Sequence, residues 1–362
     1  MISPVMANYA RADIAFEKGE GVYLYASDGT RYLDFGGGIA VTCLGHCHPH
    51  LVEALTRQAG QLWHCSNLYQ IPEQTRLAER LVAASFADSV VFINSGAEAV
   101  ECGLKLVRRY QVEAGHPEKN RIITCSGSFH GRTLATISAA KQEKHMQGFS
   151  PMLDGFDQVP FGNINEMRAT ITDATAGILV EPIQGEAGIV VPPGDYLPRV
   201  RRLCTQHDVL MIADEIQSGL ARTGRTFACD HWSVVPDVYL LGKALGGGVV
   251  PLSAVVADED VLGVLHPGEH GSTFGGNPLA AAIGTTVVDI LRRGEFQRRS
   301  AELGAHLHDR LQGLTGRGVL DVRGKGLWAG VDIDPALGSG KQVSLRLAER
   351  GVLVKDTHGS TL

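Results

Sequence analysis

Residues 240–248 read Leu240-Leu241-Gly242-Lys243-Ala244-Leu245-Gly246-Gly247-Gly248, and they join an apolar strand to a glycine-rich turn. Lys243 stands directly after the strand, and lysine is rarely buried without a counterion or a function. A partly desolvated lysine near other cations can lose its proton and attack a carbonyl. The flanking glycines would leave room for a flat ligand. A lysine whose amine reaches the surface is the simpler alternative, and its place at the end of a strand argues against it.

Apolar strands alternate with helices along most of the chain. The strand-like runs are short and apolar, which is typical of strands that are buried on both faces. They are Val90–Ile93, Arg121–Cys125, Gly177–Val180, Val209–Ala213, Asp237–Leu241 and Leu252–Ala257. Helical stretches such as 97–111 and 199–207 separate some of them. This order predicts a mostly parallel α/β sheet with helices on both faces.

The pattern changes after about residue 277. Helical stretches over 278–293, 296–311 and 341–350 alternate with short strands over 319–323, 326–332 and 352–354. This order predicts a smaller α+β unit at the end of the chain. Near the start, residues 21–34 read as two short strands around a turn at 27–30.

The composition excludes several classes of protein. The 362 residues include 33 basic and 39 acidic ones, which gives a net charge of −6 without a long run of one sign. Duplex nucleic acid and anionic membranes are therefore not expected partners. No apolar run reaches the ~18 residues of a membrane helix, and residues 1–20 lack the apolar core of a signal peptide. Seven cysteines in a long chain fit a reducing compartment, so we expect a cytoplasmic protein.

Three further loops are expected near Lys243, because ligands of parallel sheets bind beyond the carboxyl ends of the strands. The run Asn94–Glu98 either caps a helix or leaves free N–H groups for a phosphate. Asp214 and Glu215 end a buried strand, where one acid either neutralises a cationic ring nitrogen or caps a helix. The run Gly271–Asn277 offers two hydroxyls and three glycines to a phosphate, or forms a plain turn.

Two other runs imitate known motifs. Residues 219–226 nearly match a P-loop, but Arg225 replaces its lysine and the glycines do not follow the strand directly, so NTP binding is not expected. Residues 43–48 look like metal ligands, but no second cluster with zinc spacing follows. A tight turn at Gly45 before a helix that begins at Pro49 explains this run better, and no metal site is expected.

Taken together, the loops resemble those of one family. The chain carries in order Asn-Ser-Gly-Ala-Glu-Ala (94–99), Phe-His-Gly-Arg (129–132), Glu-Pro-Ile-Gln-Gly-Glu (181–186), Asp-Glu-Ile-Gln (214–217), Gly-Lys-Ala-Leu (242–245) and Gly-Ser-Thr-Phe-Gly-Gly-Asn (271–277). This set resembles the class III, pyridoxal-phosphate-dependent aminotransferases in the ornithine and acetylornithine branch, over essentially the whole chain. The resemblance implies a fold-type I enzyme that works as a homodimer with active sites at the subunit interface. It also implies an N-terminal segment, 1–45, that is part of the small domain, a large domain over 46–285, and an incomplete C-terminal small domain over 286–362.

The resemblance also implies which residues bind pyridoxal 5′-phosphate. Lys243 looks like the lysine that forms a Schiff base with the cofactor and then acts as general acid and base. Asp214 would keep the ring nitrogen protonated, so that the ring acts as an electron sink, and Gln217 would bond the ring oxygen O3′. The other implied cofactor-binding residues are Ser95, Gly96 and Ala97 at the phosphate, Phe129, His130 and Ile216 around the ring, and Ser272 and Thr273 from the partner subunit.

The substrate pocket departs from the family in two ways. Arg132 resembles the family's arginine for a substrate carboxylate. Ornithine enzymes, however, carry a substrate-binding tyrosine where this chain has Ile39, and the first half of the chain looks like the acetylornithine enzymes. The family also continues after Leu362 with an arginine that binds the oxo acid and pairs with the glutamate matching Glu186. We therefore expect Glu186 to lack this partner and the second half-reaction to be weakened.

The resemblance implies an ornithine δ-aminotransferase, which passes the δ-amino group to 2-oxoglutarate and yields glutamate. N-acetylornithine is the alternative donor. A free α-ammonium needs an acceptor, whereas an acetamide needs an apolar wall and one donor. Ile39 favours acetylornithine, and the larger matching region from about Glu186 onward favours ornithine. An inactive fragment that only binds the cofactor is the alternative that is not an enzyme.

Overall fold

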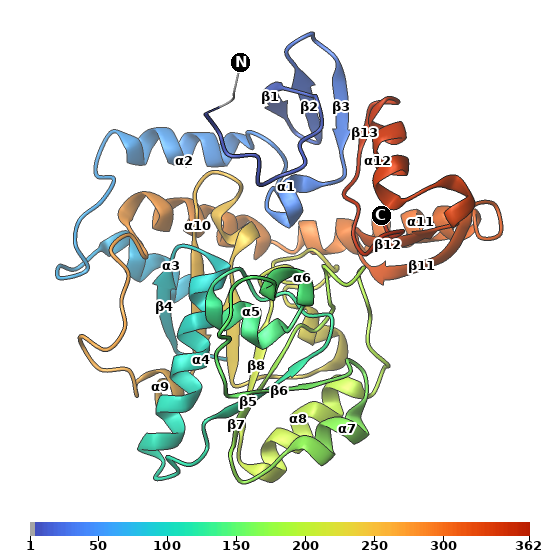
Figure 1. Cartoon of the computed structure of the whole chain (residues 1–362). Helices are drawn as coiled ribbons and strands as arrows, with labels where there is room; N and C mark the ends of the chain where they lie inside the picture. The colour runs from blue at the N-terminus through green and yellow to red at the C-terminus, as the bar shows by residue number, and fades with distance from the viewer. Residues whose placement is uncertain (1–3) are drawn as a thin grey trace.

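The centre of the molecule is a seven-stranded sheet with the strand order β4-β10-β9-β8-β7-β5-β6 (Figure 1). This computed structural model describes residues 4–362. The strands are β4 (Ser89–Ile93), β5 (Arg121–Cys125), β6 (Phe156–Val159), β7 (Thr175–Val180), β8 (Leu210–Asp214), β9 (Val238–Leu241) and β10 (Ser253–Ala257). Neighbouring strands run parallel except at β10, which is antiparallel to both β9 and β4. The predicted, mostly parallel sheet is confirmed, with one reversed strand that apolar composition alone does not reveal.

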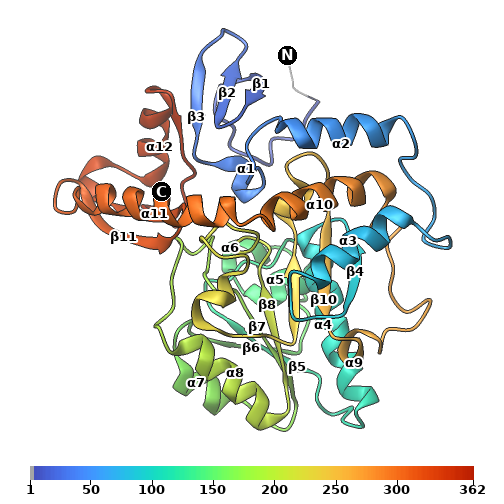
Figure 2. The same cartoon turned by 180° about the vertical axis from the view of Figure 1, so that it is seen from behind.

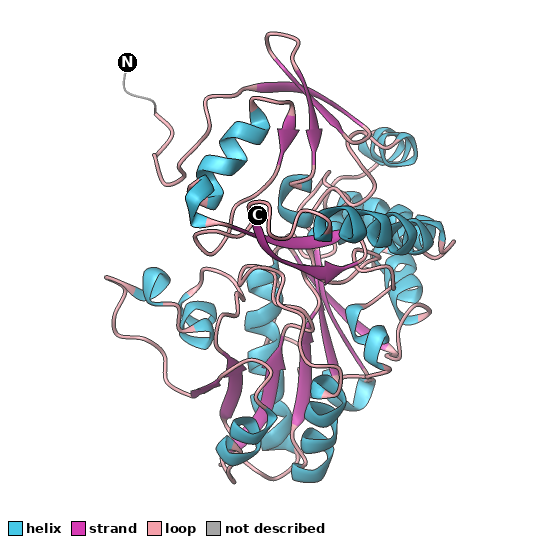
Figure 3. Cartoon of the chain, turned by 90° about the vertical axis from the view of Figure 1, so that its right-hand side faces the viewer, coloured by secondary structure: helices cyan, strands magenta, loops and turns pink. Residues whose placement is uncertain are grey.

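Helices cover both faces of this sheet (Figure 3). Alternate side chains of a strand point to opposite faces, so Leu210 and Ile212 of β8 join one core cluster, and Met211 and Ala213 join the other. The helices that pack into the first cluster are α4 (Gly96–Glu113), α5 (Leu134–Ala140) and α9 (Glu259–Leu262). Those in the second are α2 (Pro49–Ala59), α3 (Pro72–Val82), α7 (Ile164–Thr170), α8 (Tyr196–His207) and α10 (Pro278–Leu291).

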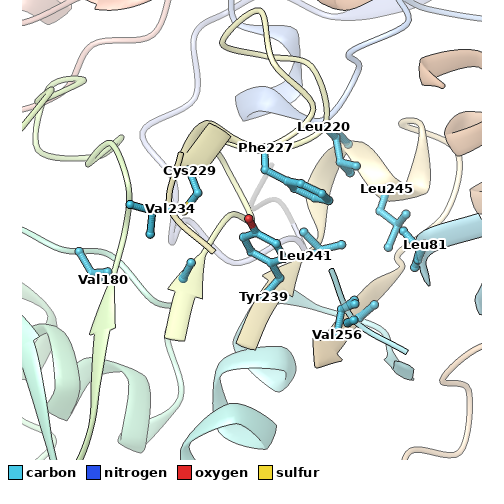
Figure 4. Close-up of a cluster of buried hydrophobic side chains, with 14 of the residues drawn as sticks. Leu81, Val180, Leu220, Phe227, Cys229, Val234, Tyr239, Leu241, Leu245 and Val256 are labelled. Carbon is cyan, nitrogen blue, oxygen red and sulfur yellow. The ribbon is translucent and has the colours of Figure 1, made fainter. Parts of the chain in front are cut away.

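Aromatic and aliphatic side chains fill the second cluster beneath the loop that follows β8. The rings of Phe227 and Tyr239 stack with their centroids 4.5 Å apart and an interplanar angle of 20°. Figure 4 shows these rings with Leu220, Leu241 and Leu245 close by. The burial of these apolar side chains fixes the loop over 220–227 against the sheet.

The two ends of the chain meet in a second sheet. Strands β1 (Phe16–Glu20), β2 (Tyr23–Ala26) and β3 (Arg31–Asp34) are antiparallel, and β13 (Val352–Leu353) pairs in parallel with β3. Both views of Figures 1 and 2 place the blue strands beside the red C-terminal part. That part also contains α11 (Glu295–Gln312), the antiparallel pair β11 (Val319–Lys325) and β12 (Trp328–Ile333), and α12 (Gly340–Ala348). The domain limits near residues 45 and 285 stay a prediction.

Several short elements complete the chain. They are the helices α1 (Gly37–Ala40) and α6 (Glu143–Met146) and the 3-10 turns η1 (Ala228–Trp232), η2 (Lys243–Gly246) and η3 (Pro335–Leu337). The sequence does not predict β1, α3 or β6, because β1 is largely exposed and α3 buries only Leu77 and Leu81 along its length. The predicted turn before α2 is confirmed, with Gly45 at a φ of 85° and Pro49 as the first helical residue.

Candidate active site

Five strand ends converge on one cavity of about 160 Å³. Asp214 ends β8 and is paired in register with Leu240 of β9, so Lys243 emerges at the same edge of the sheet three residues later. The loops after β4, β5 and β7 end there too. The lining residues are Gly96, Ala97, Phe129, His130, Gly131, Glu181, Asp214, Ile216, Gln217 and Lys243. The structure therefore brings together eight of the predicted site residues.

Lys243 is held in an unusual environment. Its φ of 44° lies in the left-handed region, which costs free energy for a residue with a side chain and is found mainly at functional sites. Burial lowers the pKa of the Lys243 amine, while the carboxylates of Asp214, Glu181 and Glu186 act against this shift. A larger fraction of this amine is therefore neutral, and able to act as a nucleophile or base, than of an exposed lysine.

Asp214 and His130 form a buried pair at the base of the cavity. His130 Nδ1 lies 2.7 Å from Asp214 Oδ2, and the N–H of Ile216 donates to Asp214 Oδ1 over 3.1 Å. Burial opposes protonation of His130, but its hydrogen bond to Asp214 and the charges of Asp214 and Glu181 outweigh burial and raise the pKa of His130. His130 Nε2 is buried without a partner among the described residues. A cation that contacts Asp214 would meet a carboxylate already held in one orientation.

The N-terminus of α4 forms one wall of the cavity. Ser95 caps this helix through a capping box with Glu98, so its hydroxyl is engaged and Ser95 itself does not line the cavity. The backbone N–H groups of Gly96 and Ala97 make no hydrogen bond to the described residues, because the first turn of a helix has no intrahelical acceptors. Free N–H groups at the positive end of an 18-residue helix are suited to a phosphate.

Close packing around the cavity limits its size. A Cβ atom on Gly96 would lie 3.0 Å from the side chain of Ile216, so Ile216 packs directly on the helix start. Gly131 has a φ of 133°, and a Cβ atom there would lie 2.7 Å from the Cβ atom of Ala97. Phe129 also lines the cavity, and its backbone N–H donates to Glu181 Oε2 over 3.0 Å.

A second cavity of about 430 Å³ begins where the first ends, since Gln217 lines both. Its wall is mainly apolar and includes Ile39, with Glu186, Arg222 and Lys355 as the charged residues. Glu186 Oε2 accepts a hydrogen bond from Lys355 Nζ over 3.1 Å. Glu186 thus has a lysine partner that the sequence motif does not indicate, and the expectation that it lacks an arginine partner stays a prediction.

Besides Ser95, three predicted site residues lie outside both cavities. Ser272 accepts a hydrogen bond from Asn94 Nδ2 over 2.7 Å, and Thr273 beside it is exposed. Arg132 is exposed and its guanidinium lies 5.5 Å from the ring centroid of Phe129. Arg132 therefore lies beside Phe129, which lines the cofactor cavity, while Ser272 and Thr273 line neither cavity of this chain.

Two residues at the site are missed by sequence reasoning. Glu181 directly follows the buried strand β7, which is the same signal that singles out Asp214, and burial raises its pKa to about 7. Arg222 lies in the run that resembles a P-loop, and comparison with that motif hides its position in the second cavity. Among the described residues, no helix is long and apolar enough to cross a membrane, and no cluster of three metal-binding side chains occurs.

Known proteins are similar to this chain in sequence and in overall fold. The chain matches the family described as "Aminotransferase class-III" over residues 5–362. It is 49% identical over 332 residues to the acetylornithine aminotransferase of Agrobacterium fabrum, covering 91% of this chain and 83% of that protein. It is 42% identical over 356 residues to the ornithine aminotransferase of an Exiguobacterium species, covering 98% and 88%.

A solved structure supports the same relationship. The ornithine aminotransferase of Toxoplasma gondii, described with partial occupancy of pyridoxal phosphate (PLP) at its active site, has a TM-score of 0.96 to this chain at 38% identity. The alignment covers 99% of this chain and 85% of that one. The homologues are thus acetylornithine or ornithine aminotransferases. The chain belongs to the class-III aminotransferases, the fold-type I transaminases that depend on PLP.

Proposed function

We propose that this enzyme holds PLP on Lys243 and transfers the δ-amino group of ornithine to 2-oxoglutarate. The observation that carries the proposal is the placement of Lys243 in one cavity with the Asp214–His130 pair and the free N–H groups of Gly96 and Ala97. These groups fit the cofactor, because they offer a nucleophile, a carboxylate for a ring nitrogen and donors for a phosphate.

Bound PLP supplies an electron sink that weakens the bonds at the carbon carrying the amino group. Asp214 would hold a proton at the ring nitrogen, and the contact with His130 keeps its carboxylate oriented. Lys243 would hold the cofactor until the substrate amine displaces it, and its freed amine, whose pKa is lowered by burial, would then move a proton at the substrate carbon. Ile216 and Phe129 line the cavity and exclude water from it.

The choice of ornithine as donor depends on Glu186. Its Oε2 pairs with Lys355, whereas its Oε1 makes no hydrogen bond to the described residues. This free carboxylate oxygen can accept from the α-ammonium group of ornithine, which an apolar wall alone would leave without a partner.

N-acetylornithine is the second candidate donor, and one observation favours it. Ile39 presents an apolar side chain to the second cavity, which suits an acetamide better than a charged ammonium. The relative at 49% identity is also an acetylornithine aminotransferase, whereas the ornithine aminotransferase of the Exiguobacterium species is 42% identical.

We also propose that two copies of the chain form a homodimer, working in the cytoplasm. Leu68 is 89% exposed, Tyr69 70% and Phe274 57%, and these apolar side chains lie on neighbouring loops. Asn67 Nδ2 donates to Ser272 O over 3.1 Å and to Gly275 O over 3.0 Å, which joins the two loops. A shared interface would cover these side chains and bring Ser272 and Thr273 to the partner's cofactor. Seven free thiols fit the reducing cytoplasm.

Two measurements test the proposed function. Borohydride reduction followed by peptide mass mapping should place a pyridoxyl group on Lys243, and a label elsewhere would contradict the assignment. Steady-state kinetics with ornithine and N-acetylornithine side by side should give the higher kcat/KM for ornithine. Glu186→Gln should lower kcat/KM for ornithine about tenfold and leave that for N-acetylornithine nearly unchanged. The reverse preference in the unmodified enzyme would replace ornithine by acetylornithine as donor.

A further inference from the structure

His46 and Asp34 form a hydrogen-bonded pair that lines neither the cofactor cavity nor the second cavity. His46 Nε2 lies 2.8 Å from Asp34 Oδ2, and the two side chains are only 18% and 7% exposed. A carboxylate only accepts hydrogen bonds, so His46 Nε2 carries the hydrogen. The backbone of His46 also exchanges two hydrogen bonds with Gly21, over 2.7 Å and 3.0 Å. The N-terminal sheet therefore fixes this histidine, although the proposed reaction gives it no part.

The chain between Asp34 and His46 contains a turn that is costly to form. Residues 37–40 all have φ values between 53° and 65°, in the left-handed region, and two of them carry side chains. A β-branched residue such as Ile39 is seldom found in this conformation, which persists only where the surroundings hold it. Asp34 Oδ1 accepts a hydrogen bond from the N–H of Gly37 over 2.9 Å. One carboxylate thus joins the start of the strained turn to His46.

The segment before His46 reaches a second strained turn, residues 243–248, which carries Lys243. Cys43 donates from its thiol to the carbonyl oxygen of Ala244, with the sulfur 3.8 Å from that oxygen. Burial raises the pKa of Cys43 to about 11, so the thiol keeps the proton that it donates. Ala244 directly follows Lys243, whose own φ of 44° needs support from its neighbours.

Two further contacts with the turn 243–248 come from residues on either side of His46 in the sequence. The methyl group of Thr42 packs against Gly248, where a Cβ atom would lie only 2.7 Å from it. Leu51 packs against Gly247 in the same way, with a distance of 2.8 Å between Leu51 Cδ1 and such an atom. Residues before and after His46 therefore press on this turn, and His46 fixes the segment between them.

We propose that His46, held by Asp34, is a positioning residue for Lys243 and acts through residues 42–51. A displacement of a reacting group by about 1 Å can lower a rate about 100-fold. Because His46 lines neither cavity, its loss should lower kcat and leave KM nearly unchanged. The inference rests on the proposed function in giving Lys243 the proton transfer, but its effect on residues 243–248 can be measured without turnover.

The kinetic test compares two variants of His46 with a control on α2. His46→Ala should lower kcat about 10- to 100-fold, with KM for the amino donor nearly unchanged. His46→Gln keeps an N–H that can donate to Asp34, so it should recover most of this loss. His50→Ala removes a histidine that is 56% exposed and should leave kcat unchanged. Unchanged kcat in His46→Ala, or a raised KM at unchanged kcat, would overturn the proposal.

Hydrogen exchange in the PLP-free protein gives a readout that is independent of turnover. In the turn 243–248, the N–H groups of Leu245 and Gly247 donate over 3.0 Å to carbonyl oxygens earlier in the chain. His46→Ala should speed exchange several-fold in a peptide that covers this turn and leave exchange in β5 unchanged. Acceleration by the same factor in both would show a general loss of stability and would overturn the proposal. Unchanged exchange in the turn would overturn it too.

A milder variant keeps the proposal testable if His46→Ala does not fold. Thr42→Ser removes the methyl group that packs against Gly248, so it should speed exchange in 243–248 and lower kcat by less than His46→Ala. No change in either measurement for Thr42→Ser would contradict the route through this contact. If the unmodified holoenzyme takes the amino group from neither donor while exchange in 243–248 responds to His46→Ala as expected, the proposed function is wrong and the positioning role stands.

Discussion

His130 Nδ1 and Asp214 Oδ2 lie 2.7 Å apart in a part of the molecule where neither side chain reaches solvent. His130 lies in the loop after β5 and Asp214 is the last residue of β8, and β7 separates these two strands in the sheet. Burial opposes protonation of His130, but the hydrogen bond and the charge of Asp214 outweigh burial and raise the pKa of His130. The contact with His130 and the hydrogen bond from the Ile216 N–H hold the Asp214 carboxylate in one orientation at the cavity.

Replacing Asp214 by asparagine should separate cofactor binding from turnover. Asp214→Asn keeps the shape of the side chain, and so the cavity should still load PLP, as measured by visible absorbance. A neutral amide cannot hold a proton at the ring nitrogen by charge, so kcat should fall about 100-fold or more. Asp289→Asn, at an exposed ion pair with Arg80, is the control and should retain its activity. Near-native turnover of Asp214→Asn would show that Asp214 only stabilises the backbone after β8.

The melting temperature should respond to Glu181 in a pH-dependent way. Burial raises the pKa of Glu181 to about 7, so between its ordinary value and 7 the folded protein holds a proton that the unfolded chain has lost. Stability from this residue therefore falls as the pH rises through that window. The side chain in Glu181→Gln does not titrate. The melting temperature of this variant, minus that of the unmodified protein, should therefore be larger at pH 8 than at pH 5.

Comparing the two melting temperatures at both pH values removes any effect of the substitution that does not depend on pH. Glutamine cannot accept from both Phe129 N–H and Gly185 N–H, and this loss is the same at both pH values. Glu302→Gln, on the exposed face of α11, should show no such pH trend. An equal difference in melting temperature at pH 5 and pH 8 for Glu181→Gln would contradict the raised pKa.

Adding a methyl group at Gly131 should damage the cofactor cavity. Alanine at a φ of 133° is strained, and its Cβ atom would lie 2.7 Å from the Cβ atom of Ala97. We expect Gly131→Ala to lose about 2–4 kcal/mol of unfolding free energy and most of its PLP affinity. Gly115→Ala has a φ of 86° and nothing within 4 Å of the new atom, so it should lose about 1 kcal/mol and bind PLP normally. If both variants lose the same unfolding free energy in denaturant titrations, the close approach to Ala97 does not destabilise Gly131→Ala.

A charge on the exposed apolar loop should dissociate the proposed dimer. Leu68→Arg places a guanidinium where we expect an interface, so sedimentation or light scattering should report a monomer with weakened cofactor binding. Leu320→Arg alters another exposed leucine, 56% exposed on β11, and should leave the mass unchanged. A Leu68→Arg variant that keeps the mass of the unmodified protein would place the interface elsewhere.

Sequence reasoning succeeds where one local rule determines the position of a residue. Apolar strands followed by Lys243 or Asp214 predict the shared sheet edge, because parallel strands deliver their carboxyl ends to one side. The match to the aminotransferase family confirms the fold and the cofactor implied by the motifs.

Sequence reasoning fails where the position of a residue depends on contacts between distant segments of the chain. The reversed direction of β10 and the ion pair between Glu186 and Lys355 join parts of the chain that no local pattern connects. Glu181 shows a different limit. Its place directly after β7 gives the same signal as that of Asp214, but the motif over 181–186 to which it belongs directs attention to Glu186. Arg222 is obscured in the same manner by its likeness to a phosphate-binding loop.

The pairing of β13 with β3 sets an order of events during synthesis. Leu33 can pair with Val352 only after Val352 has been synthesised. A ribosome that adds 5–20 residues per second needs roughly 15–60 s to make the intervening chain. Strands β4 to β10 all leave the ribosome before that, although β4 has to wait for β10, its one neighbour in the sheet. The nascent N-terminal meander β1–β3 therefore carries an unpaired strand edge for most of translation, a period in which chaperones rather than native contacts must protect it.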